Sequence, residues 1–232
     1  MAGIKQIKPR SKPRLIIVLD EWLNETIDGY LTGVMTPPRP GVFHPSTLSN
    51  ACDRFVWLVY HGHMPSSTLD ANLQRIFQNG NYLEKRVESW FAGLGILIGR
   101  EIPVKFENPS ISGRIDFLIR HQEHGISPIE LKSINTSGFS KLSKPKDEHS
   151  LQLQMYLNMG NYDIGTVLYE NKNDQKIKSF IVKRDIKQWD DLLSRCFNIQ
   201  NMVEPPMKCT GPAWCNCKHV NMDEVKAKIS EG

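Results

Sequence analysis

Hydrophobic spacing along the chain predicts helices that flank and interrupt a block of strands. Apolar residues recur at helical spacing in a segment that opens at MPSSTLD and ends near Gly93 or Gly95. Strand-like segments then dominate from Ile96 to Ile134, and a lysine-rich loop follows over 136–149. A further helix is predicted at 150–160, strands at 165–171 and 176–182, and a last helix at 185–203. This order of elements implies a mixed α/β domain.

The N-terminal part of the chain predicts a different kind of structure. Residues 1–14 are typical of a flexible basic arm, and the short apolar run Leu15 to Leu19 predicts a strand or packing segment. A Pro/Gly-rich loop at 36–46 ends at Ser46, which we expect to cap a helix through about Val59. The predicted units are an arm at 1–14, a helical segment carrying Cys52 at 15–60, a core at 61–200, and a cysteine-rich tail at 201–232 that packs on the helical segment.

Composition sets the broad class. The 232 residues suit one domain with a small appended subdomain. Hydrophobic residues make up 40% of the chain, but no apolar run approaches the length that a bilayer span needs. Without a secretory signal, we expect a cytoplasmic protein that does not enter membranes. The net charge of +4 is modest. Basic residues nevertheless gather in two clusters, which either meet phosphates or are solvated: Lys5, Lys8, Arg10, Lys12 and Arg14, and Lys141, Lys144 and Lys146.

The stretch SGRIDFLIRHQEHGISPIELKSIN carries the most chemistry. Ile115, Phe117 and Ile119 alternate with polar positions, so Asp116 is expected to face away from one apolar row. If HQEHG is a hairpin loop, residue 120 pairs with 126 and Asp116 lies opposite Glu130, with their Cβ atoms roughly 4.5–5.5 Å apart.

Two carboxylates so close favour a bound cation. Oxygen ligands suit a hard ion such as Mg²⁺ or Mn²⁺, and Lys132 shares the face of Glu130 because the two lie two residues apart. Lys132 is then placed to position a water or to stabilise charge on a phosphate. The alternative is a half-exposed hairpin with an ordinary cross-strand salt bridge.

Glu84 is a third candidate ligand. On a helical wheel it lies among apolar residues that describe one buried stripe: Leu73, Ile76, Phe77, Gly80, Val87 and Phe91. An inward carboxylate is costly unless a cation or a salt bridge satisfies it. Glu88 lies nearby on the same wheel and is a rival.

Taken in order, these residues resemble the motifs of the RecB-like PD-(D/E)XK nucleases, including the CRISPR-adaptation nuclease and its phage-borne relatives. The matching elements are Gly80 with Glu84, Gly113 with Asp116, Glu130 with Lys132, and Gln152 with Tyr156. Many relatives have His at the position of Glu84. The lambda-type exonucleases have Glu there, as this chain does. The resemblance covers roughly residues 46 to 218.

This resemblance implies a restriction-endonuclease-like core, with a central mixed sheet flanked by helices and a small cysteine-rich, metal-stapled subdomain. It implies that Glu84, Asp116 and Glu130 bind metal and that Lys132 is catalytic. Gln152 and Tyr156 then belong to the active-site or DNA-contacting helix, and their i, i+4 spacing does place them on one helix face.

The cysteines form a second group. Five cysteines without a secretory signal, three of them crowded near the C-terminus, suggest metal rather than disulfides. Cys52 followed by Arg54 also resembles the iron–sulfur members of the group, which implies a 4Fe-4S cluster on four cysteines: Cys52, Cys209, Cys215 and Cys217. Zinc is the alternative, held by the three tail cysteines with either Cys52 or His219. Cys196 is expected to be a core thiol.

These features favour a Mg²⁺- or Mn²⁺-dependent DNA exonuclease that acts on DNA ends. A sequence- or structure-specific endonuclease on the same core and a catalytically idle nucleic-acid-binding module are the alternatives. The expected partner is DNA. Three further expectations rest only on the resemblance. It implies a role in DNA recombination, repair or processing. It also implies recombination proteins or single-strand-binding proteins as partners, and a bacterial cell or phage-infected host as the location.

Overall fold

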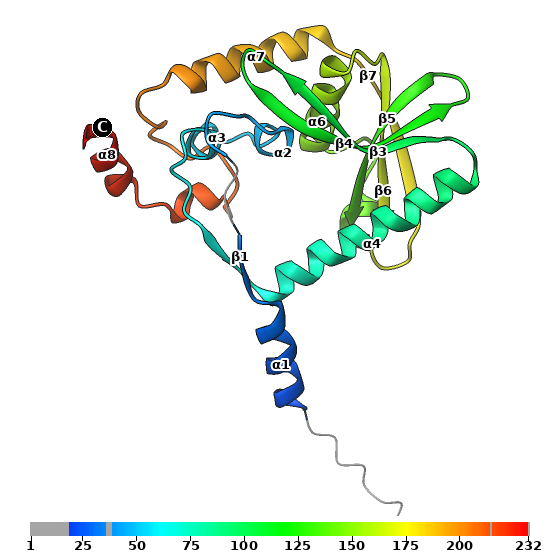
Figure 1. Cartoon of the computed structure of the whole chain (residues 1–232), viewed down its shortest axis with the longest axis horizontal. Helices are drawn as coiled ribbons and strands as arrows, with labels where there is room; N and C mark the ends of the chain where they lie inside the picture. Colours follow the sequence, from blue (N-terminus) through cyan, green and yellow to red (C-terminus); the bar gives the residue numbers. More distant parts are fainter. Residues whose placement is uncertain (1–18, 36–38, 214, 232) are drawn as a thin grey trace, which may run out of the picture.

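The computed structural model describes residues 19–35, 39–213 and 215–231. Its elements are α1 (Glu21–Leu31), β1 (Gly33–Met35), α2 (Pro45–Leu48), α3 (Asp53–Tyr60), β2 (Ser67–Leu69), α4 (Ala71–Gly93), β3 (Leu97–Phe106), β4 (Ile111–His121), β5 (Gly125–Ile134), α5 (Thr136–Ser140), α6 (Asp147–Met159), β6 (Ile164–Asn171), β7 (Ile177–Lys183), α7 (Ile186–Asn201), the 3₁₀ helix η1 (Asn216–His219) and α8 (Met222–Glu231). Figure 1 shows the sheet and α4 on one side of the molecule and α2, α3 and α8 toward the other. Within the described ranges, no helix combines the length and the hydrophobicity that a bilayer span requires.

The core is a five-stranded sheet in the order β3-β4-β5-β6-β7. Only β5 and β6 are parallel, and α6 lies in the connection between them. Leu153 and Leu157 of α6 pack on one face of this sheet, and Leu83 and Val87 of α4 pack on the other. The predicted mixed sheet flanked by helices is therefore confirmed, and each strand predicted between residues 96 and 182 is present.

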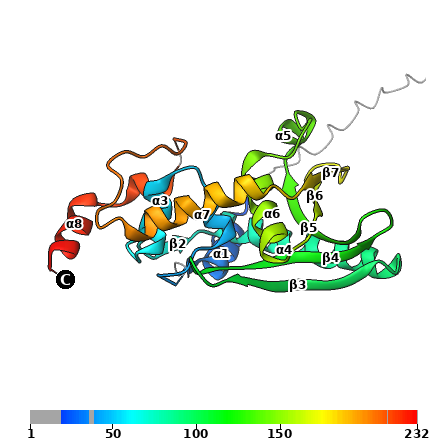
Figure 2. The same ribbon diagram turned by 90° about the horizontal axis from the view of Figure 1, so that it is seen from above.

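A second packed cluster joins α3 to the helices α7 and α8. Val56 and Trp57 of α3 pack with Ile199 of α7 and Val225 of α8. Figure 2 shows α7 running from beside α6 to α3, and α7 contacts both helices. One long helix thus links the sheet to the part of the molecule that carries the cysteines.

The predicted helix from Ser46 to Val59 is wrong in its continuity and in its cap. His44 is the N-cap of α2, and Ser46 lies inside that helix because Pro45 suits a first helical turn. The chain then breaks before α3, since the Asn50 side chain accepts a hydrogen bond from the Cys52 amide at 2.8 Å. Cys52 therefore becomes the N-cap of a separate helix.

The long helix also differs from its prediction at its start. Asp70 caps α4 by accepting from the Leu73 amide at 2.7 Å, so the helix begins at Ala71 and the residues before it form β2. The predicted stripe is buried only where α4 lies on the sheet. Ile76 and Phe77 remain 51% and 45% exposed because that half of the helix extends toward α1.

The predicted loop at 136–149 is partly helical, and most of the predicted N-terminal segment lies outside the described residues. The loop predicted at 136–149 contains α5, which Asn135 caps by accepting from the Gly138 amide at 2.8 Å, and α6 begins at Asp147. The basic arm at 1–14 and most of the apolar run Leu15 to Leu19 lie outside the described residues.

Candidate metal and nucleic-acid site

Asp116, Glu130 and Lys132 lie on the neighbouring strands β4 and β5 of the sheet. Arg120 pairs with Ile126 and Phe117 with Ile129, which is the register predicted from the hairpin loop. Asp116 is the next residue beyond this ladder, and its Oδ2 accepts a hydrogen bond from the Leu131 amide at 2.8 Å. Asp116 is thereby held beside the strand that carries Glu130 and Lys132.

The strand is irregular at Asp116, and this corrects the prediction of one apolar row. Ile115 packs in the cluster beneath α6, whereas Phe117 and Ile119 pack in the cluster beneath α4. The β3 residue across from Asp116 is Glu101, whose φ of 52° is in the left-handed region. The local irregularity changes the face of the sheet to which successive apolar residues point.

Glu130 is the most constrained member of the site. It is 0% exposed, and neither carboxylate oxygen has a hydrogen-bond partner of normal geometry among the described residues. Lys132 Nζ lies against Oε1 as an ion pair without that geometry. A buried carboxylate left this way is costly, and a divalent cation is a ligand that satisfies it.

The pKa values of the acidic residues are shifted because their carboxylates are buried and lie close to one another. Burial, followed by the charge of Asp116, raises the pKa of Glu130 to about 8, although Lys132 opposes the shift. Burial also raises the pKa of Asp116, and burial together with Asp116 raises that of Glu84. The Lys132 pKa is raised despite burial, because Glu130 and Asp116 favour its charged form. The three side chains offer carboxylate oxygens, the donors that Mg²⁺ and Mn²⁺ prefer.

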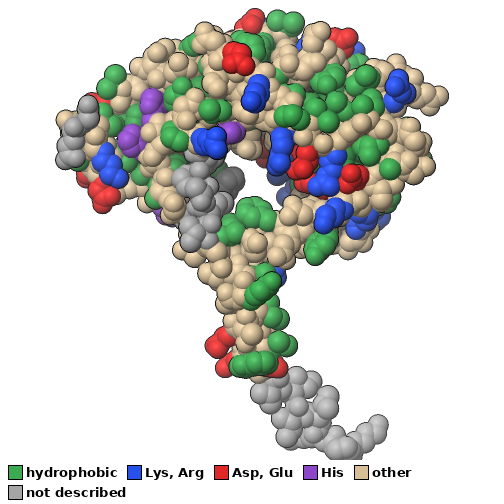
Figure 3. All heavy atoms as spheres, viewed as in Figure 1, with side chains coloured by type: hydrophobic (Ala, Val, Ile, Leu, Met, Phe, Trp, Pro, Cys, Tyr) green, Lys and Arg blue, Asp and Glu red, His purple; other side chains and the backbone are tan. Residues whose placement is uncertain are grey.

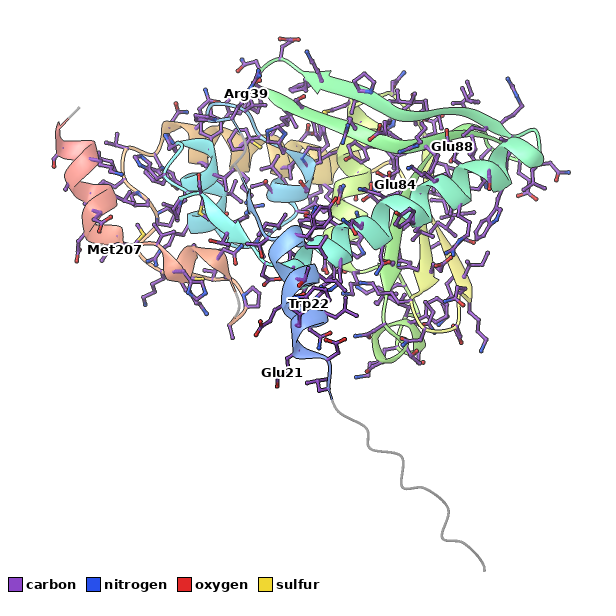
Figure 4. The ribbon with its side chains drawn as sticks, turned by 60° about the horizontal axis from the view of Figure 1, so that its bottom comes forward. Glu21, Trp22, Arg39, Glu84, Glu88 and Met207 are labelled. Carbon is purple, nitrogen blue, oxygen red and sulfur yellow. The ribbon has the colours of Figure 1, made fainter. Side chains whose placement is uncertain are left out.

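The two rival glutamates of α4 have different surroundings. Both lie between α4 and the strands in Figure 4. Glu88 accepts a hydrogen bond from Arg100 of β3 at 2.9 Å, whereas Glu84 lies 3.5 Å from the same guanidinium. Glu84 also lines a cavity together with Asp116. These contacts favour Glu84 over Glu88 as the third carboxylate.

Gln152 and Tyr156 lie on the α6 face that borders this cavity. The Gln152 amide donates to the Tyr156 hydroxyl at 3.2 Å, and both side chains are buried. Burial, then Glu130, raises the pKa of Tyr156. A Cβ on Gly113 would lie 2.9 Å from the Tyr156 ring, so the glycine allows α6 to approach Asp116.

His149 was missed by sequence analysis and lies one turn before Gln152 on α6. Its Nδ1 lies 2.8 Å from the Tyr169 hydroxyl, which accepts from the Lys146 amide at 3.0 Å. Tyr169 is the β6 neighbour of Lys132. Burial, then the charge of Lys132, lowers the pKa of His149 to about 4. The i, i+3 spacing of His149 and Gln152 could have placed both residues on one face of a helix. A single histidine without a second motif residue gave no reason to apply that spacing.

A cavity of about 990 Å³ opens beside the carboxylates. Figure 3 shows a hollow at the centre of the molecule, with acidic and basic side chains on its edge. The cavity's charged and polar lining comes from α2, α4, β3, β4, α6, the segment before α2 and the turn between β3 and β4: Arg39, His44, Ser46, Glu84, Glu101, Lys105, Glu107, Ser110, Ser112, Arg114, Asp116, Gln152 and Tyr156. Cations and two of the candidate carboxylates, Glu84 and Asp116, therefore border one space.

The second predicted basic cluster is partly neutralised. Lys144 pairs with Asp147 at 2.8 Å and Lys146 with Glu148 at 3.6 Å. The cavity cations Arg39 and Lys105 were not singled out from the sequence, because only the fold brings them together.

The four predicted ligand cysteines come together although Cys52 is far from the others in sequence. The sulfur atoms of Cys52, Cys209, Cys215 and Cys217 all lie within 4.8 Å of one another, so the four thiols form a site that can hold a metal. His219 is exposed and outside this group, and the structure therefore favours Cys52 as the fourth ligand. Cys196 is a core thiol, and burial raises its pKa to about 12.

Comparison with known proteins places the fold. No protein-family model and no curated protein matches the chain. Among solved structures, SSO0001 aligns with a TM-score of 0.56 at 14% identity, over 86% of this chain and 93% of that one. The alkaline exonuclease LHK-Exo from Laribacter hongkongensis aligns with a TM-score of 0.50 at 15% identity, over 83% of this chain and 95% of that one. The chain therefore shares the fold of these two solved structures.

Proposed function

We propose that the chain is a Mg²⁺- or Mn²⁺-dependent deoxyribonuclease that hydrolyses phosphodiester bonds at DNA ends. The observation that carries the proposal is Glu130, a fully buried carboxylate without a hydrogen-bond partner in the described structure, beside Asp116 and Lys132. The likeness to LHK-Exo, an alkaline exonuclease, supports a nuclease on this fold.

The mechanism uses three carboxylates and one amine. Glu84, Asp116 and Glu130 would hold the cation, which would supply an activated water and a polarised phosphate. Lys132, kept charged by Glu130 and Asp116, orients that water and stabilises the charge that develops on the phosphate. The Leu131 amide fixes Asp116 through its 2.8 Å hydrogen bond, so one ligand needs little reorganisation.

DNA enters through the adjoining cavity. Arg39, Lys105 and Arg114 line that space and provide cations for phosphate oxygens. Arg114 is 3.1 Å from Glu101, and we expect a phosphate to compete for this guanidinium. Gln152 and Tyr156, on the α6 wall, position the strand near the carboxylates.

The test uses metal-free protein with matched linear and circular DNA, to which Mg²⁺ or Mn²⁺ is then added. We expect both metals to support degradation of linear DNA only. Nicking of circles indicates the endonuclease alternative, and binding without cleavage indicates the idle module. Asp116→Ala, Glu130→Ala and Lys132→Ala should each abolish cleavage and leave circular dichroism unchanged. Full activity in any of the three contradicts the site.

The cysteine site and the biological role complete the proposal. We propose that the four cysteines hold a structural metal that joins the tail to α3. A role in DNA recombination or repair, and recombination or single-strand-binding proteins as partners, rest on the resemblance alone. They stay predictions.

A further inference from the structure

The spacing of the four cysteine sulfurs bears on which metal they hold. Cys52 Sγ lies 3.6 Å from Cys209 Sγ and 3.6 Å from Cys217 Sγ, and Cys215 Sγ lies 3.4 Å from Cys217 Sγ. These separations are well beyond a disulfide bond of about 2 Å. All four cysteines are free. The sulfurs thus enclose a small space without being bonded to one another.

A single tetrahedral ion matches this space. With zinc–sulfur bonds of about 2.3 Å, the sulfurs of a Zn(Cys)₄ site lie about 3.8 Å apart, since the edge of a tetrahedron is about 1.6 times its centre-to-corner distance. The three separations of 3.4 to 3.6 Å approach that value.

A 4Fe-4S cluster needs a larger cage. Its four irons occupy alternate corners of a cube, and each carries one cysteine sulfur pointing outward, which sets the thiolate sulfurs roughly 6 Å apart. The four sulfurs of this chain all lie within 4.8 Å of one another. The cluster implied by the resemblance therefore does not fit the residues as they are arranged.

The local sequence keeps the cage small. Cys215 and Cys217 are separated by one residue at the start of η1. A Cβ on Gly211 would lie 2.9 Å from Cys215 Sγ and 3.0 Å from Cys52 Cβ, so the 209–217 loop presses its glycine against the thiols. Expansion to the size of an iron–sulfur cluster would require this loop and the start of α3 to separate.

We propose that the four cysteines hold one tetrahedral Zn²⁺ ion and not an iron–sulfur cluster. The ion joins the start of α3 to the 209–217 loop. Three hydrogen bonds parallel this link: Arg54 to the Pro206 carbonyl at 2.8 Å, Trp57 to the Met202 carbonyl at 2.9 Å, and Thr210 to the Ala51 carbonyl at 3.3 Å.

The cysteine site is also close along the chain to one part of the cavity lining. α2, which contributes His44, Pro45 and Ser46 to the cavity lining, ends only a few residues before Cys52. The zinc is therefore structural, and its removal should loosen the DNA-binding wall and leave the three carboxylates on their helix and strands.

The experiment is metal and sulfide analysis of full-length protein produced with both iron and zinc present and purified without oxygen. We expect one zinc per chain, no acid-labile sulfide and no brown colour. Iron with an equal amount of labile sulfide overturns the proposal, as does one iron per chain without sulfide. Absence of both metals overturns it too.

A spectroscopic measurement distinguishes this site from the carboxylate site. Protein produced with Co²⁺ in place of zinc should show the intense visible bands of a tetrahedral thiolate complex. Cys209→Ala should reduce these bands and lower the zinc content at least tenfold, whereas Cys196→Ala and Asp116→Ala should change neither. Unchanged bands in Cys209→Ala contradict the four-thiolate site whether or not the protein proves to be a nuclease.

Discussion

Glu84 and Glu88 illustrate how one contact decides between neighbouring residues. Glu84 was expected to point inward, and Glu88 was its rival because the helical wheel separates the two residues little. Arg100, which belongs to β3, hydrogen-bonds Glu88 at 2.9 Å, and Glu84 remains the carboxylate that borders the cavity with Asp116. The sequence pattern carries no information on this partner, since it depends on how α4 lies across the sheet.

We predict that Glu84→Ala lowers Mg²⁺-dependent cleavage about 100-fold or more, because it removes a metal ligand. Glu88→Ala should have a much smaller effect. Metal-free Glu84→Ala should also be no less stable than wild type, since burial and Asp116 already disfavour the charged form of Glu84. Cleavage rates and melting temperatures of both variants check this. A larger loss in Glu88→Ala reverses the assignment.

His149 allows a prediction of pH dependence away from the metal ligands. Its folded pKa of about 4 lies below the ordinary value of 6.5, because burial and Lys132 disfavour the charged ring. The unfolded chain therefore binds the proton first as the pH falls, and stability decreases between about pH 6.5 and 4.

We predict that His149→Gln flattens this part of the stability profile, by on the order of 1–2 kcal/mol across the window once the water that still reaches the ring is allowed for. His219→Gln, which changes an exposed histidine, is the matched control. Denaturant unfolding at several pH values in this range measures the effect. An unchanged slope in His149→Gln means that the ring is not held neutral.

At the scale of elements, the sequence predicted what local patterns determine. The predicted turn HQEHG set the register of β4 and β5, in which His121 and Gly125 themselves pair, and strand-like segments located β3 to β7 but not β1 or β2. The errors arose where a side chain overrides local propensity. Asn50 hydrogen-bonds the Cys52 amide and divides the predicted helix into α2 and α3, and Asp70 delays the start of α4.

The break between α2 and α3 is held from outside by Arg195 of α7. Its guanidinium donates to the Leu48 and Asn50 carbonyls at 2.7 Å each and to Asp53 at 2.7 Å. These carbonyls are left free where α2 ends, so α7 supplies donors that the short helix lacks. A local sequence pattern does not reveal this, because Arg195 lies far along the chain.

We predict that Arg195→Ala destabilises the protein by about 2–4 kcal/mol, because three charge-assisted hydrogen bonds lose their donor. Arg195→Lys should recover only part of this loss, since an ammonium cannot reproduce the planar fork. Arg184→Ala, which removes an arginine that contacts Asn161 and Asp163, is the comparison. Equal stability of Arg195→Ala and wild type contradicts the role given to α7.

At the scale of the whole molecule, the fold joins features that are separate in sequence. The motif order suggested the carboxylates and the cysteine clamp; the fold gathers the four cysteine sulfurs within 4.8 Å of one another and places Glu84 and Asp116 on one cavity. The cavity was not predicted. Arg39 precedes α2 and Lys105 lies in β3, and neither belongs to a basic run that would attract attention. Their shared position depends on the backbone pairing of Phe43 with Ser110 and Ser112, which docks the segment before α2 on β4.

The cavity gives the last prediction, which concerns affinity for DNA. If Arg39 and Lys105 contact phosphates, Arg39→Ala with Lys105→Ala should weaken binding of every sequence about equally and reduce the slope of log Kd against log salt by about 2. Binding is measured in Ca²⁺ by titration at several salt concentrations, so that cleavage does not interfere. Lys226→Ala, which removes an exposed lysine of α8, should leave the slope unchanged. Since neither cavity cation is a metal ligand, the double variant should still cleave at saturating DNA, and loss of cleavage without a change in salt slope would place the DNA elsewhere.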